Sequence, residues 1–130
     1  VVIRDWSSDV CSSDLIRLDD GSTWSFSFPS ASEASASLAT GGAPGTVPVG
    51  LDGIWRRGEL GQAFGPAPPN PVLARGAWEG ADTFRVEIRM TSDTYTYVFR
   101  FRFLPDGTVD ERCDVPELGR EIERLQGRFE

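Results

Sequence analysis

The sequence contains no histidine and no lysine. Without histidine there is no Ser-His-Asp or Cys-His nucleophile system and no imidazole ligand for a metal. Without lysine there is no Walker A phosphate loop, no Schiff base and no Ser-x-x-Lys pair. Because most familiar active sites are excluded, we expect a chain that is not itself an enzyme and has no catalytic residues, no cofactor and no metal.

Long apolar runs and net positive charge are also missing. No run approaches the roughly 20 residues of a membrane span, so we expect no membrane partner. The net charge of −7 argues against a nucleic-acid partner, because binding to phosphates needs a basic footprint. The first residues do not form a signal peptide, and the sequence indicates no compartment.

Residues 5–15, DWSSDVCSSDL, nearly repeat one Ser-Ser-Asp unit and resemble, codon by codon, a reading frame of a common short-read sequencing adapter. We therefore expect residues 1–15 to be an artefactual peptide, and residues 16–130 to be a single β-domain truncated at its N-terminus. Cys113 is then the only genuine cysteine. If residues 5–15 are true protein, a bridge between Cys11 and Cys113 has to be considered.

Turn residues and alternating apolar residues are abundant. Fourteen glycines and nine prolines favour an all-β fold with many turns. Period-two alternation predicts half-buried strands, which together form an antiparallel meander. The predicted strands cover residues 16–18, 23–28, 34–39, 47–60 with a glycine bend, a stretch ending at 78, 84–90, 94–103 and 108–113.

The last residues have a different spacing. Leu118, Ile122 and Leu125 recur at helical intervals behind a possible Asp114 cap and Pro116. This spacing predicts a short C-terminal amphipathic helix.

One aromatic stripe alternates along residues 95–103. Its members are Tyr95, Tyr97, Phe99, Phe101 and Phe103. As a core these rings would pack against one another, and as a cavity lining the first four would surround a small apolar ligand. Trp24, Trp55 and Trp78 lie in different predicted strands, where core or rim positions compete with a stacking platform.

Four arginines alternate toward the opposite side of two neighbouring predicted strands: Arg85, Arg89, Arg100 and Arg102. They suit an anion clamp or a surface that docks another domain. Pairing with carboxylates such as Glu87 on a solvated face explains them equally well. The pair Asp110-Glu111 and the other acidic residues lie mostly near turns, which seldom fix two carboxylates for acid and base catalysis.

The segment from Arg75 to Phe103 resembles the C-terminal β-domain of serine hydrolases of the β-lactamase and penicillin-binding-protein type. In that family a strand ending near a tryptophan is followed by an acidic turn, Asp-Thr-Phe, an alternating strand and a returning strand before an Asp-Gly turn. Trp78, residues 82–84 and Asp106-Gly107 match this order. Strand spacing extends the resemblance to residues 16–113, although no motif in residues 24–60 is diagnostic.

The resemblance implies a lipocalin-like half-barrel beside a hydrolase domain. The Ser-x-x-Lys pair and tyrosine of such a parent would belong to an upstream catalytic domain, so Tyr95 and Tyr97 receive no catalytic role. We expect a non-catalytic accessory β-domain whose partner is that missing domain of the same polypeptide. The alternative is a lipocalin-like barrel that binds a small apolar ligand. The predicted helical tail departs from the family pattern.

Overall fold

The computed structural model describes residues 15–39, 45–60, 70–91 and 95–129. Residues 1–14 therefore lie outside the described residues, and with them nearly all of the predicted adapter peptide and Cys11. The described chain is almost entirely strand and turn. Its elements are β1 (Ile16–Leu18), β2 (Thr23–Ser27), β3 (Glu33–Ala39), β4 (Gly45–Gly50), β5 (Arg56–Leu60), β6 (Asn70–Glu79), β7 (Thr83–Met90), β8 (Thr96–Phe103), β9 (Thr108–Val115), the 3-10 helix η2 (Pro116–Leu118) and β10 (Arg120–Phe129).

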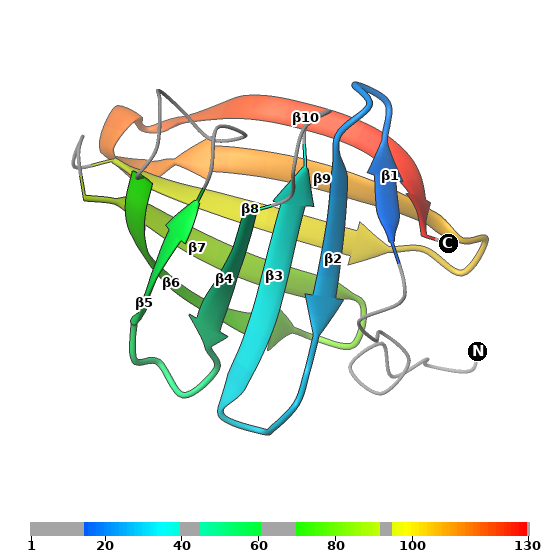
Figure 1. Cartoon of the computed structure of the whole chain (residues 1–130). Coiled ribbons are helices and arrows are strands. Elements are labelled where there is room, and N and C mark those ends of the chain that lie inside the picture. Colours follow the sequence, from blue (N-terminus) through cyan, green and yellow to red (C-terminus); the bar gives the residue numbers. More distant parts are fainter. Residues whose placement is uncertain (1–14, 40–44, 61–69, 92–94, 130) are drawn as a thin grey trace.

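The strands form one sheet that closes on itself. Their order is β4-β3-β2-β1-β10-β9-β8-β7-β6-β5, and a parallel bridge between Gly50 of β4 and Arg75 of β6 completes the ring. In the described parts of the chain this makes a closed nine-strand barrel, with β5 paired to β6 beyond the ring. Figure 1 shows β2, β3 and β4 crossing the longer strands β6–β10 at a steep angle.

This architecture confirms the mainly β, antiparallel prediction, but the barrel is closed rather than a half-barrel. Closure depends on β10, which pairs with β9 on one side and with β1 on the other. A three-residue β1 could not close the gap alone. The last strand fills the position between the two ends of the meander (Figure 1).

The predicted C-terminal helix is wrong for the same reason. Asp114 belongs to β9, and only residues 116–118 form one 3-10 turn, which ends at Gly119 in the left-handed region (φ 65°). Leu118 and Ile122 are exposed, whereas Leu125 and Phe129 pack against the core from β10. Two ladders of hydrogen bonds outweigh a local helical spacing that matched only three apolar residues.

Gly50 is required where the barrel closes. A Cβ atom placed on Gly50 would meet the carbonyl oxygen of Ile54 at 1.9 Å, because the β4–β5 loop folds back onto the end of β4. Only glycine permits this approach. The loop is thereby held against the outside of the barrel, next to β6.

Aromatic rings fill the interior. Phe101 is fully buried and lies 4.9 Å from the ring of Trp24 and 5.1 Å from that of Phe26, measured between centroids. Phe84 contacts the rings of Phe26 and Trp78 at 5.1 and 5.0 Å. Such edge-to-face and tilted pairs add to the burial of apolar area. The inner surface is therefore a packed core.

Candidate functional site

The outer surface of β7–β10 carries a row of arginines in direct register. Consecutive members face one another across neighbouring strands, as Cα partners. We call this set the arginine row: Arg85, Arg100, Arg112 and Arg124. Like charges directly opposite one another in a sheet are destabilising, so the row needs compensating carboxylates.

Carboxylates on the same surface bridge the row. Glu79 accepts hydrogen bonds of 2.9 Å from both Arg85 and Arg100, and Asp114 lies 3.2 Å from nitrogens of Arg100 and Arg112. Burial would raise the pKa of Glu79, but hydrogen bonds and charge from Arg100 and Arg85 outweigh it and hold this pKa below its usual value. The guanidinium groups are fixed in place by these bonds.

A groove of about 450 Å³ lies on this surface, across the outside of β6–β9. Its lining includes Ala77 and Val98 from the strands, Leu51 and Gly53 from the β4–β5 loop, and Pro116 from η2. The helix η2 is anchored near this end of β8, because the backbone amide and hydroxyl of Thr96 both donate to the Glu117 carboxylate at 2.9 Å. We call this feature the outer groove.

Five charged side chains complete the lining: Arg75, Arg85, Glu87, Arg100 and Asp114. Arg75 stands out among them. Its Nε donates to Glu87 Oε2 at 2.9 Å, and its guanidinium carbon lies 4.3 Å from the centre of the Trp55 ring. Stacking on an aromatic face and one hydrogen bond together fix the plane of this guanidinium group.

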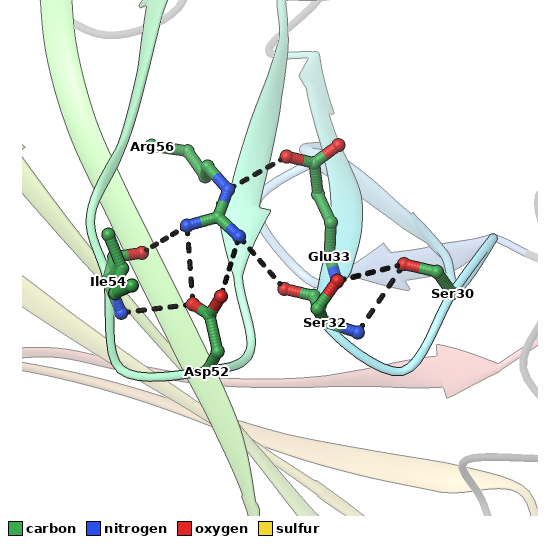
Figure 2. A network of polar contacts seen from close by, with 6 residues as sticks. All are labelled: Ser30, Ser32, Glu33, Asp52, Ile54 and Arg56. Atoms are coloured by element: carbon green, nitrogen blue, oxygen red, sulfur yellow. Dashed lines mark hydrogen bonds and ion pairs between the residues drawn. The ribbon is translucent and has the colours of Figure 1, made fainter.

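Arg56 fixes the loop that supplies Trp55. Figure 2 shows its guanidinium group between two loops, with Nε donating to Glu33, Nη1 to Asp52 and to the Ile54 carbonyl, and Nη2 to Asp52 and to the Ser32 carbonyl. All donors of this side chain are therefore used. The hydrogen bond from Arg56 lowers the pKa of Asp52. The wall of the outer groove formed by the β4–β5 loop is thus pinned to the start of β3.

The four arginines predicted from the sequence are separated in the structure. Arg85 and Arg100 line the outer groove. Arg102 is about 60% exposed, lies 3.5 Å from Asp82, and borders a second depression of about 630 Å³ that also includes Arg100. Arg89 is exposed on β7 and is not part of the outer groove lining.

The four residues predicted to line a cavity lie in different environments. Phe99 and Phe101 are buried in the core, and Tyr97 packs against it partly buried. Tyr95 precedes β8 and is 37% exposed. Trp24 is buried, Trp78 is packed against the core, and Trp55 lies outside against Arg75.

Among the described residues, Glu111 is the only charged one whose side chain is fully buried. It points to the interior between Val109 and Cys113, and neither carboxylate oxygen has a hydrogen-bond partner among the described residues. Burial first, and then the nearby Glu123 carboxylate, raise the pKa of Glu111 to about 9. Near neutral pH this side chain is therefore a neutral acid.

Cys113 is a free, buried thiol, and burial together with Glu111 raises its pKa to about 12. Such a thiol is a poor nucleophile, since the thiolate is the reactive form. Within the described ranges no three acidic or cysteine side chains are arranged to hold a metal ion. Nor is any described helix long and apolar enough to cross a membrane.

Sequence reasoning missed Arg75, Trp55 and Arg56 as members of one site. Arg75 and Trp55 are brought together by the pairing of β5 with β6, in which Arg56 lies opposite Ala74. No local pattern specifies that register. The starts of the two strands, Arg56 and Asn70, have 13 residues between them, and part of that segment shows no strand pattern in the sequence. Glu111 did have a signal, since it alternates in phase with Val109 and Cys113.

No protein-family model matches the chain, and no curated protein is found to be similar to it.

Proposed function

We propose that this chain is a non-catalytic accessory β-domain of a serine hydrolase of the β-lactamase type. The partner in this proposal is a catalytic domain upstream in the same polypeptide. Support comes first from the resemblance of residues 75–103 to the C-terminal β-domain of those enzymes. These residues span most of three adjacent strands, β6, β7 and β8, which form one wall of the barrel.

The outer side of that wall is the observation on which the proposal rests. Arg85 and Arg100 are held by Glu79 and Asp114 in fixed positions, so they would lose little side-chain freedom on meeting a partner surface. Alternating rows of arginines and carboxylates favour a complementary charged surface and reject a mismatched one. A docking role suits such a wall better than a catalytic role.

The chemistry of the described side chains supports a non-catalytic role. The chain has no histidine or lysine, and its one described cysteine is buried with a raised pKa. Glu111 is buried, and its pKa of about 9 keeps it a neutral acid near neutral pH, so it is not a general base there. These features leave the chemistry to a partner domain.

The alternative, a lipocalin-like barrel for a small apolar ligand, draws support from the closed barrel alone. Ring contacts of about 5 Å among Trp24, Phe26 and Phe101 argue against it, because they occupy the interior that such a ligand would need.

Reading the source DNA upstream of the codon for Ile16 tests the proposal. We expect an in-frame domain that contains a Ser-x-x-Lys pair and a catalytic tyrosine. A stop codon directly before Ile16, or an in-frame domain of another kind, contradicts the proposal.

Association of the two domains tests the docking surface itself. The recovered catalytic domain and this chain are mixed as separate polypeptides, and their dissociation constant is measured by calorimetry. Arg102→Glu on the outer wall should weaken association by about tenfold. Arg57→Glu on β5 makes the same charge change elsewhere and should leave it unchanged, and equal effects of the two variants contradict docking through this wall.

A further inference from the structure

The outer groove contains one arginine with an unused donor edge. Arg75 donates a hydrogen bond only through its Nε, to Glu87, while neither terminal nitrogen has a partner among the described residues. Arg56, which lies opposite Ala74 in the ladder of β5 and β6, uses all of its donors by comparison. A guanidinium edge with two parallel N–H donors matches the two oxygens of a carboxylate.

The orientation of this edge is set before any ligand arrives. The Trp55 ring covers one face of the Arg75 guanidinium group at 4.3 Å, and Glu87 is only 17% exposed and holds Nε. Trp55 is itself positioned by the pinned β4–β5 loop, through Arg56. Because the group is already ordered, a ligand would not pay the usual entropy for fixing an arginine side chain.

Charge and shape limit the ligand. The three arginines of the lining differ in how far they are compensated. Arg85 and Arg100 each have two carboxylate partners, from Glu79, Glu87 and Asp114, whereas Arg75 has only Glu87. A doubly charged anion would meet Glu87 and Asp114 at close range, whereas a single negative charge would not be repelled as strongly. Ala77, Val98 and Leu51 offer apolar contact beside the arginines, and the volume of about 450 Å³ is that of a small-ligand site.

We infer that the outer groove is a binding site for a carboxylate attached to a compact apolar group, with Arg75 as the residue that pairs with the carboxylate. A free small molecule and the C-terminal end of a peptide both supply this chemistry. The groove shares Arg85 and Arg100 with the wall proposed for docking, but the inference rests on the groove's own side chains, and its test uses this chain alone.

Titration of the ¹⁵N-labelled full chain at constant ionic strength tests this site. The probes are N-acetyl-valine, its amide, inorganic phosphate, and the tripeptide acetyl-Ala-Ala-Val with a free C-terminus. We expect saturable shifts of the Trp55 indole and the Gly53 and Ala77 amides with at least one of the two carboxylates. The amide and phosphate should bind about tenfold more weakly. Which carboxylate binds identifies the source of the ligand.

Variants assign the binding to Arg75. Arg75→Gln should weaken binding by about tenfold, and Arg75→Lys, which keeps the charge but loses the paired donors, should also weaken it. Arg57→Gln is the matched control on the exposed side of β5 and should bind as the wild type does. If Arg75→Gln does not fold, as judged from its amide spectrum, Arg75→Lys decides.

Four results overturn the inference. They are the absence of saturable shifts, equal binding of the amide, tighter binding of phosphate, and unchanged binding by the folded Arg75 variants.

Discussion

Strands β7, β8 and β9 have two surfaces of opposite character. The inner surface consists of aromatic and aliphatic side chains, and Phe84 and Phe101 are fully buried there. The outer surface consists of arginines and carboxylates, with Arg85 and Arg100 bridged by Glu79. Adjacent residues of one strand thus serve different purposes: one set supplies most of the free energy of folding, and the other presents ordered charge to the surroundings.

Glu111 is the exception that makes the comparison informative. It lies on the inner surface, where every neighbour in its strand phase is apolar, yet it is a carboxylic acid, and the nearby Glu123 carboxylate raises its pKa further instead of compensating it. Its burial is tolerable because the raised pKa keeps it protonated near neutral pH.

Phe101→Ala removes a fully buried ring and should lower the free energy of unfolding by about 3–5 kcal/mol. The neighbouring Arg102→Ala truncates a side chain that is about 60% exposed and should change it by about 0.5 kcal/mol or less. Urea denaturation measures both. Similar losses in these two adjacent positions would show that the inner and outer surfaces do not differ as described.

Glu111→Gln should change how stability depends on pH. The folded pKa of about 9 lies above the usual 4.5, so the unfolded chain ionises first and the wild type loses stability as pH rises through this window. The loss is about 1.4 kcal/mol for each pH unit, or about 3 kcal/mol from pH 5 to pH 7.

Denaturation at several pH values should therefore show that the free energy of unfolding of Glu111→Gln rises relative to that of the wild type as pH increases. The exposed Glu59→Gln is the matched control and should follow the wild type. A constant difference between Glu111→Gln and wild type from pH 5 to pH 8 would mean that Glu111 is not held as a buried neutral acid.

Arg56→Gln should loosen the β4–β5 loop while leaving the core intact. The variant loses the bonds to Asp52, Glu33 and the Ser32 carbonyl, so the fall in stability should be smaller than that of Phe101→Ala. Hydrogen exchange of the Ile54 amide, which donates to Asp52, reports the loop directly. Exchange should accelerate in Arg56→Gln and not in Arg57→Gln, and unchanged protection would refute the pinning role.

Arg75→Gln should have a small effect on stability, about 1 kcal/mol or less, because it removes one partly exposed ion pair with Glu87 and the stacking on Trp55. The same variant is expected to lose carboxylate binding. A large loss of stability on denaturation would place Arg75 among the structural residues instead.

The success of sequence reasoning differed between parts of the barrel. Strands β7 and β8 were predicted nearly to the residue, because Phe84 to Met90 and Tyr97 to Phe103 alternate without interruption. The sequence predicts a helix where β10 lies, because the inward positions of this strand are Glu123, Leu125, Gly127 and Phe129, of which two are not apolar. Pairing with β9 along most of its length, and with β1 more than 100 residues away, makes it a strand.

The candidate site was predictable only in part. Arg85 and Arg100 followed from alternation, and the structure brings both to the outer groove. The sequence predicts one bent strand over residues 47–60, whereas the structure has β4 and β5 joined by a loop that Arg56 fixes. The contact of Trp55 with Arg75 depends on that loop and on strand register, neither of which local spacing encodes.

The most direct test of the division between a filled interior and a binding exterior is a titration of the folded chain with an apolar fluorescent probe of fatty-acid size. The account predicts no saturable binding that quenches the buried Trp24, because Phe26, Phe99 and Phe101 occupy the space around it. Saturable one-to-one binding with quenching of Trp24, abolished when Phe101 is replaced by tryptophan, would contradict it and make the interior the binding site.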